Sequence, residues 1–160
     1  MLGSSEVTNL MKALVVYDTM FGNTEKLARA LAAGLESGGA TAEVVKVDSV
    51  KPEELRGADL LCVGSPTHAW NASKPTKEFL ERLQKFENLD RKKAFAFATK
   101  MRSRLAGDAG GKIEDKLKEA GYAIARHSVT AIVGGREGPL EEGAEETFRK
   151  IGAELAETQM

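Results

Sequence analysis

The turn Thr19-Met20-Phe21-Gly22-Asn23-Thr24 decides how the rest of this chain is interpreted. It lies between an apolar run, Ala13–Tyr17, and a helical repeat of leucines four residues apart that begins at Leu27. A strand that turns directly into a helix leaves the first backbone N–H groups of that helix free, at the positive end of its dipole. No Lys or Arg lies between Asp18 and Glu25, so the sequence predicts a phosphate site made of neutral dipoles.

Apolar runs alternate with amphipathic helical patterns along the rest of the chain. We predict strands at Lys12–Tyr17, Ala42–Asp48, Asp59–Gly64, Lys93–Thr99 and Ile124–Val133. We predict helices at Thr24–Glu36, Lys74–Phe86, Ala109–Ala120 and Leu140–Ala156, with a short one at Pro52–Leu55 and Ser73 as an N-cap. Runs such as Leu60–Val63 are apolar on both faces, as in parallel strands covered by helices on both sides. The pattern predicts an α/β, three-layer doubly wound fold with a five-stranded parallel sheet.

Size and composition exclude several classes of protein. We expect one domain at residues 11–160 after a disordered tail at 1–10. With 23 Lys and Arg against 24 Asp and Glu, the net charge of −1 gives no case for nucleic-acid binding. No apolar run approaches the roughly 20 residues that a membrane span needs. The single cysteine, Cys62, excludes an internal disulfide and a thiolate zinc cluster, and favours a reducing, cytoplasmic compartment.

Ligands of doubly wound sheets lie beyond the carboxyl ends of the strands, so the loops at that edge carry the function. They are the first loop (Asp18–Asn23), the second loop (Ser65–Ser73), the third loop (Lys100–Asp108) and the fourth loop (Gly134–Pro139).

Two of these loops resemble those of a known family. Tyr17–Lys26 resembles the phosphate-binding loop of flavodoxins, especially that of the flavodoxin domain of flavodiiron proteins. Ser65–Asn71 resembles the Ser-Pro-Thr segment that lies beside the flavin ring in the same family. Both follow the expected strands, and the alternating pattern covers Met11–Ala156. The resemblance to short-chain flavodoxins implies the strand order 2-1-3-4-5 and a non-covalent FMN used for one- or two-electron transfer.

The first loop offers two kinds of phosphate donor. We expect side-chain hydrogen bonds from Thr19, Asn23 and Thr24, and backbone N–H groups from Met20, Phe21 and Gly22. The alternative is that Asn23 or Thr24 simply caps the helix.

In the second loop we expect FMN contacts from Pro66, Thr67, His68, Ala69, Trp70 and Asn71. Trp70 is the only tryptophan and is expected to stack on the flavin; the alternative is an exposed indole that covers a helix. His68 is expected to contact the flavin or a partner; the alternative is a solvated histidine with no role. The family commonly has a glycine here, whereas this loop has none, and Asn71 is expected to adopt left-handed angles most easily.

The third loop departs most from the family pattern, because it lacks the aromatic residue that usually packs on the flavin. We expect FMN contacts from Thr99, Lys100, Met101, Arg102 and Ser103. A basic run consists of Arg91, Lys92, Lys93, Lys100, Arg102 and Arg104. The run is either a solvated face or a surface on which a redox partner docks. We also expect Lys100, Arg102 or Arg104 to lie close enough to the flavin to raise its reduction potential.

No catalytic acid, base or nucleophile is required. Cys62 lies inside a predicted strand and is expected in the core, and the dinucleotide glycine motif and the GK[ST] motif are both missing. The leading hypothesis is a small FMN-binding electron carrier, monomeric or weakly dimeric, that serves redox partner proteins. The alternatives are an FMN-dependent NAD(P)H:quinone or flavin reductase, and an interaction module without cofactor.

Overall fold

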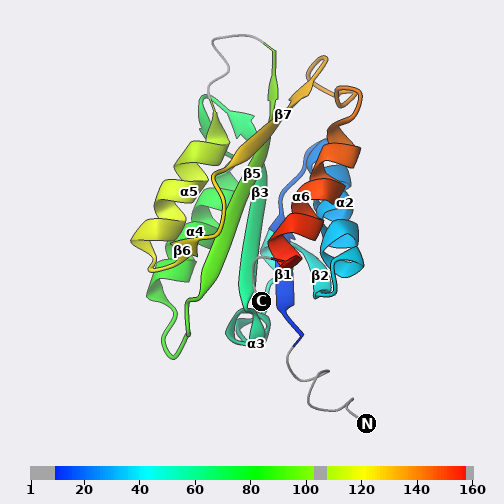
Figure 1. The fold of residues 1–160 in the computed structure, drawn as a ribbon. Coiled ribbons are helices and arrows are strands. Elements are labelled where there is room, and N and C mark those ends of the chain that lie inside the picture. Colours follow the sequence, from blue (N-terminus) through cyan, green and yellow to red (C-terminus); the bar gives the residue numbers. More distant parts are fainter. Residues whose placement is uncertain (1–9, 103–107, 158–160) are drawn as a thin grey trace.

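A parallel β-sheet forms the middle layer of the computed structural model, which describes residues 10–102 and 108–157 (Figure 1). The strand order is β2 (Thr41–Lys46), β1 (Lys12–Tyr17), β3 (Leu60–His68) and β5 (Lys93–Met101), followed by β6 (Ala123–Ile124) and β7 (Val129–Val133), which both pair with β5. The predicted order 2-1-3-4-5 is confirmed, with the fifth strand divided in two. A short β4 (Asn71–Ala72) pairs antiparallel with the end of β3.

The division of the fifth strand corrects the predicted continuous strand Ile124–Val133. Helix α5 (Ala109–Glu119) places Glu114 beside the connection between β6 and β7, where its Oε1 accepts the backbone N–H of Ser128 at 2.7 Å. This N–H is therefore bonded to a side chain, and pairing with β5 resumes only at Val129.

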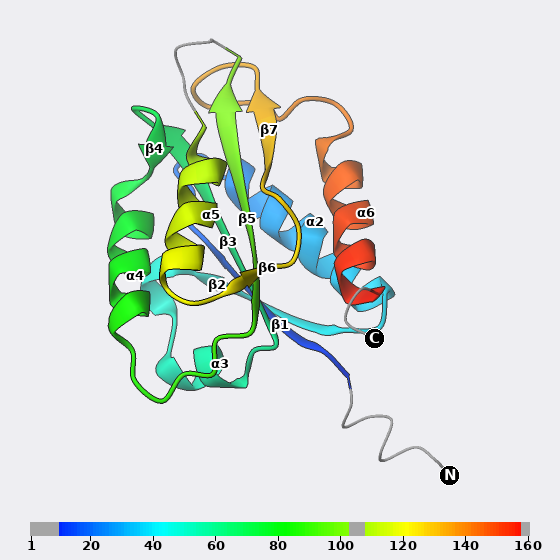
Figure 2. The ribbon, with the colours of Figure 1, turned by 60° about the vertical axis from the view of Figure 1, so that its left-hand side comes forward.

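Helices cover both faces of the sheet (Figures 1 and 2). One face packs against α2 (Asn23–Ser37) and α6 (Ala144–Glu157). The other packs against α3 (Pro52–Gly57), α4 (Lys74–Lys85) and α5, with a single 3₁₀ turn at Val47–Ser49. Alternate residues of β1 point to opposite faces, so Val15 joins the first core and Leu14 the second. The predicted three-layer fold is confirmed.

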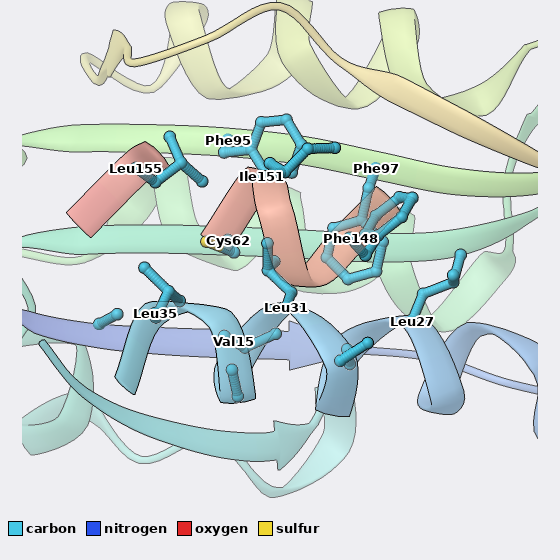
Figure 3. Packing of buried hydrophobic residues seen from close by; sticks show 14 of the residues in the cluster. Val15, Leu27, Leu31, Leu35, Cys62, Phe95, Phe97, Phe148, Ile151 and Leu155 are labelled. Atoms are coloured by element: carbon cyan, nitrogen blue, oxygen red, sulfur yellow. The ribbon is translucent and has the colours of Figure 1, made fainter. Parts of the chain in front are cut away.

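Helices α2 and α6 approach each other closely. Leucines of the predicted repeat on α2 face the apolar side chains of α6 (Figure 3). Between them Gly34 and Gly152 leave no room for a side chain, because a β-carbon at Gly152 would lie 2.3 Å from the carbonyl oxygen of Leu31.

Helix α6 begins at Ala144 and not at Leu140, as the sequence pattern predicted. Leu140 instead forms an antiparallel bridge with Val133, and the Glu141 N–H donates to the Ile132 carbonyl at 2.8 Å. The chain thus turns back along β7 before the helix starts, which draws the fourth loop over the edge of the sheet.

Residues 1–9 of the expected N-terminal tail lie outside the described residues. Within the described ranges, none of the helices combines the length and the apolar character needed to cross a membrane.

Candidate functional site

A cavity of about 450 Å³ lies at the carboxyl edge of the sheet, where all four loops meet. It is lined by Thr19, Met20, Phe21, Asn23, Thr24, Pro66, Thr67, His68, Thr99, Lys100, Met101, Val133 and Arg136. Its volume is within the range of about 300–1,000 Å³ that accommodates cofactor-sized ligands. The structure thus brings together residues of the first three loops that sequence reasoning selected.

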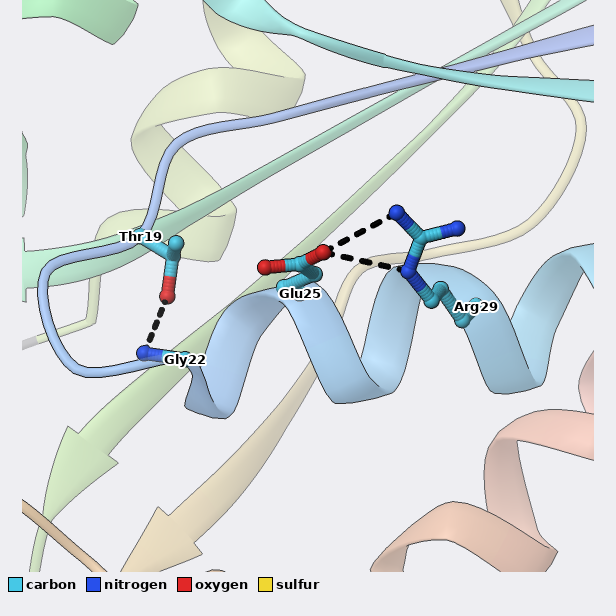
Figure 4. A network of polar contacts seen from close by, with 4 residues as sticks. All are labelled: Thr19, Gly22, Glu25 and Arg29. Carbon is cyan, nitrogen blue, oxygen red and sulfur yellow. Dashed lines mark hydrogen bonds and ion pairs between the residues drawn. The ribbon is translucent and has the colours of Figure 1, made fainter.

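The first loop ends at an uncapped helix N-terminus. Gly22 is left-handed, with φ 89° and ψ −3°, and its N–H donates to Thr19 Oγ1 at 2.9 Å (Figure 4). The first hydrogen bond of α2 runs from the Lys26 N–H to the Gly22 carbonyl at 3.1 Å, and no side chain caps the helix. The N–H groups of residues 23–25 precede that bond, so they are the free donors of this helix end. The alternative that Asn23 or Thr24 caps the helix is wrong.

Side chains at the start of α2 also connect the first loop to its neighbours. Asn23 Nδ2 donates to the Glu137 carbonyl of the fourth loop at 3.1 Å. Thr24 Oγ1 lies 3.3 Å from Thr99 Oγ1 at the end of β5, and both threonines are buried. One hydroxyl proton of this pair and one amide proton of Asn23 are left for a ligand. Asn23 and Thr24 were expected only to donate to phosphate, and they also connect the start of α2 to the fourth loop and to β5.

A network of hydroxyl groups joins the first and second loops. Ser73 Oγ donates to Asp18 Oδ2 at 2.6 Å and lies 2.9 Å from Thr76 Oγ1. Ser65 Oγ accepts the Ser73 N–H at 3.0 Å. Ser73 occupies the predicted N-cap position of α4, but its hydroxyl makes no capping bond to the helix backbone. It links the ends of β1 and β3 instead.

The second loop is a tight hairpin between β3 and β4. His68 pairs with Asn71, so Ala69 and Trp70 form the two-residue turn, with φ values of 49° and 70°. Positive φ at both central residues is typical of type I′ turns, which favour Asn and Gly. The left-handed residues are thus Ala69 and Trp70, and the expectation that placed this role on Asn71 is wrong.

Members of the second loop differ in how they face the cavity. Pro66, Thr67 and His68 line it, whereas Ala69, Trp70 and Asn71 are not among the lining residues. Thr67 Oγ1 also accepts the N–H of Ala109 at the start of α5, at 3.2 Å. Trp70 is 54% exposed, at the tip of the turn between β3 and β4. Its stacking on a flavin stays a prediction.

The third loop contributes Lys100 and Met101 to the cavity, and Thr99 of β5 lies directly before them. Arg102 is exposed and is not among the lining residues, and Ser103 and Arg104 lie outside the described residues.

The described residues of the basic run lie at the two ends of β5. Arg91 binds the carbonyls of Leu83 and Phe86, at 2.8 and 2.9 Å, near the end of α4. Lys92 pairs with Asp59 at 2.8 Å. Both lie before β5, whereas Lys100 is near its end, about 25 Å away for a strand of this length. The described part of the run, residues 91–93 and 100–102, is therefore spread along β5, and partner docking on the surface from Arg91 to Arg104 stays a prediction.

Sequence reasoning missed Arg136, which lines the cavity from the fourth loop. Its guanidinium carbon lies 5.9 Å from the ring centroid of Phe21 in the first loop. The fourth loop turns back on itself through bonds from the Gly134 N–H to the Pro139 carbonyl and from the Gly138 N–H to the Gly135 carbonyl. The available signal for Arg136 was the sequence Gly-Gly-Arg directly after the last strand. That strand ends at the same edge of the sheet as β1, β3 and β5, so a cation that follows it can reach the cavity.

Exposed apolar side chains gather around this edge. Of the large apolar side chains that are exposed in residues 10–102 and 108–157, Met20, Phe21, Trp70 and Met101 belong to the first three loops or the strand end beside them, and only Leu10 lies elsewhere. Such clustering marks a site for an apolar ligand or a partner. Cys62, by contrast, is fully buried in β3, and this burial raises the pKa of its thiol, which confirms it as a core residue.

Comparison with known proteins points to one family. A family model for flavodoxin matches residues 15–151. A flavodoxin of Aquifex aeolicus is 32% identical over 167 residues, which cover 91% of this chain and 85% of the relative. A solved flavodoxin from the domain Archaea superposes with a TM-score of 0.78 at 27% identity, covering 92% of this chain and 98% of the other. The flavodiiron core of Flv1 from Synechocystis sp. PCC6803 shares the fold, with a TM-score of 0.73 at 19% identity, and there the match covers 97% of this chain and 37% of the other.

Proposed function

This chain belongs to the flavodoxin family, and we propose that it is an electron-transfer protein that holds one FMN non-covalently in the cavity at the carboxyl edge of its sheet. The observation that carries the proposal is the uncapped N-terminus of α2, which opens into the same cavity that exposed apolar side chains surround. One end of the site therefore suits a phosphate and the other suits a flat apolar ring.

Each loop has a role in this proposal. Residues Thr19–Thr24 hold the phosphate through backbone N–H groups and the remaining side-chain donors of Thr19, Asn23 and Thr24. In this proposal Pro66–Asn71 and Thr99–Ser103 flank the flavin, with Trp70 over one face. Support comes from the members of these ranges that line the cavity, which are Pro66, Thr67, His68, Thr99, Lys100 and Met101. Bound FMN supplies the one- or two-electron chemistry, and the protein supplies binding and orientation.

The proposal extends to partners and location. Its electron donors and acceptors are other redox proteins, and the chain acts as a monomer or weak homodimer. The exposed apolar side chains near the cavity support contact with a partner at this edge. The single cysteine supports a reducing, cytoplasmic setting, because nothing in the chain calls for an oxidising one.

The test begins with the purified protein. We expect a yellow protein that releases one FMN per chain on denaturation, and whose apoprotein takes up added FMN. A protein that neither carries nor takes up FMN would contradict the proposal and favour the interaction module. Steady oxidation of NAD(P)H with a quinone by this protein alone would favour the reductase.

Two left-handed glycines provide matched variants. Gly22 and Gly39 have φ values of 89° and 105°, and a β-carbon at either would meet no atom within 4 Å. Gly22→Ala distorts the phosphate loop, whereas Gly39→Ala places the same strain beyond the opposite end of α2. We expect both variants to lose similar stability, and only Gly22→Ala to lose FMN affinity.

A further inference from the structure

We propose that Arg136 is a phosphate-binding residue, which makes the cavity selective for a ligand that ends in a dianionic phosphate. The inference deepens the proposed function and rests on it, since it concerns the same site. It also revises the expectation that neutral dipoles alone hold the phosphate.

The position of Arg136 is set by contacts with the phosphate end of the cavity. Its guanidinium lies over Phe21, in the middle of the first loop, with 5.9 Å from Cζ to the ring centroid. The next residue, Glu137, accepts the hydrogen bond from Asn23 Nδ2. Gly138 also lies against Asn23, because a β-carbon at Gly138 would be 3.1 Å from the Asn23 amide atoms. These contacts hold the turn that carries Arg136 against the start of α2.

The charge of Arg136 is available to a ligand. In the described part of the chain, no carboxylate forms an ion pair with Arg136, although it lines the cavity. A cation–π contact orients a guanidinium and leaves its in-plane N–H groups free to donate. A planar guanidinium matches two phosphate oxygens better than an ammonium does. Among the described Lys and Arg residues, the other one that lines the cavity is Lys100, which follows Thr99 in the chain and belongs to the third loop.

Phosphate selectivity follows from this arrangement. The first loop has no Lys or Arg between Asp18 and Glu25, so its N–H groups offer only partial charges. A guanidinium brought in from the fourth loop adds one full positive charge at that end of the site. A ligand with a terminal phosphate would benefit from this charge, and the same ligand without phosphate would not.

The experiment compares FMN with riboflavin, which differs from it only by the phosphate. Dissociation constants of both ligands are measured by quenching of flavin fluorescence on titration with apoprotein, at low and at high salt. The proteins are the parent, Arg136→Gln, Arg136→Lys and Lys150→Gln. Lys150 is exposed on α6 and does not line the cavity, so its variant controls for a change of one unit in net charge.

We expect Arg136→Gln to weaken the binding of FMN by about 10-fold or more, which corresponds to the loss of one charge-assisted hydrogen bond. The dissociation constant of riboflavin should stay unchanged. The FMN affinity of Arg136→Gln should also depend less on salt than that of the parent. Arg136→Lys should restore part of the loss, and Lys150→Gln should match the parent with both ligands.

Other outcomes overturn the inference in distinct ways. Equal weakening of FMN and riboflavin would place Arg136 on the flavin ring or make it a support for Phe21. An unchanged FMN constant would show that the guanidinium does not reach the phosphate. If the parent protein binds neither ligand, the proposed function fails as well. If the parent binds FMN and the ratio of the FMN and riboflavin dissociation constants is the same in Arg136→Gln, only this inference fails.

Discussion

Gly152 of α6 packs directly on Gly34 of α2, and a β-carbon at Gly152 would lie 3.0 Å from the carbonyl carbon of Gly34. The same β-carbon would be 2.3 Å from the Leu31 carbonyl oxygen. Backbone therefore meets backbone at this crossing, and the layer that covers the sheet beside the phosphate loop depends on it. No rotamer change relieves such a clash, so the two helices would have to move apart.

Gly152→Ala is accordingly expected to destabilise the protein by about 1–3 kcal/mol, the usual cost of overpacking. The matched control is Gly111→Ala, because Gly111 lies in α5 and a β-carbon there meets no atom within 4 Å. That variant should gain about 0.5–1 kcal/mol, since glycine is a poor helix former. Urea unfolding measures both free energies. Stabilisation by both variants would show that the helices are not in close contact.

Acid should reduce stability through Glu114. Burial alone would raise the pKa of this carboxyl group, but the bonds from the Ser128 N–H and His127 more than offset it, and the pKa lies below its ordinary value of 4.5. Since the folded state binds the proton less readily than the unfolded chain, the stabilisation is complete above pH 4.5 and is lost as the pH falls through the lowered pKa.

Glu114→Gln should therefore be less stable than the parent near neutral pH by about 1 kcal/mol, and the two should converge in acid. Urea unfolding at several pH values from neutral to well below 4.5 provides the measurement. A difference in stability that stays constant over this range would mean that the charge of Glu114 has no part in holding the Ser128 segment.

The turn at Ala69 and Trp70 should store backbone strain. Trp70 has φ 70°, a conformation that glycine adopts freely and that tryptophan does not. Trp70→Gly is expected to make the apoprotein at least as stable as the parent, with a gain of up to about 1 kcal/mol, and to weaken FMN binding through loss of the indole.

Trp70→Phe separates the two effects of that substitution, because it retains both an aromatic plane and the strain. It should leave stability unchanged and give an intermediate FMN affinity. If Trp70→Gly binds FMN as the parent does, the indole does not cover the flavin.

Among the described residues of the basic run, Lys100 is the one that lines the cavity, so it replaces Arg102 as the expected influence on the flavin. Removal of a nearby cation disfavours the more negatively charged reduced cofactor. We expect Lys100→Gln to lower the two-electron midpoint potential by about 20–40 mV, or about 1–2 kcal/mol. Arg102→Gln, outside the cavity lining, should shift it much less. Potentiometric titration of the FMN-loaded variants measures both midpoint potentials. Equal shifts of the potential in Lys100→Gln and Arg102→Gln would contradict the assignment to Lys100.

Much of the fold could be predicted from periodicity. Strands β1, β2, β3 and β5 follow from apolar runs, and the main helices from stripes of buried residues, because these patterns arise within each element. The errors occur where a contact between separate segments decides the local structure. Glu114 takes the N–H of Ser128 and interrupts the last strand, and the bridge of Leu140 with Val133 delays the start of α6.

The candidate site also has a part that could be predicted from the sequence and a part that could not. Pro66–His68 and Thr99–Met101 meet in the cavity because topology brings strand ends together, and Thr19, Met20, Phe21, Asn23 and Thr24 join them there. Gly22 is not among the lining residues. The positive φ values of Ala69 and Trp70 could not be read from the residue types, which disfavour them. Arg136 was missed because its role depends on a contact with Phe21, more than a hundred positions away.

The hydrogen-bond network of Asp18, Ser65, Ser73 and Thr76 joins the first two loops through bonds between protein groups. A molecule that enters between these loops meets walls that are already in place. Little chain entropy would then be lost on association, so more of the contact energy would remain as affinity. The same stiffness would keep the surroundings of a redox centre nearly constant as its charge changes, which favours rapid exchange of electrons.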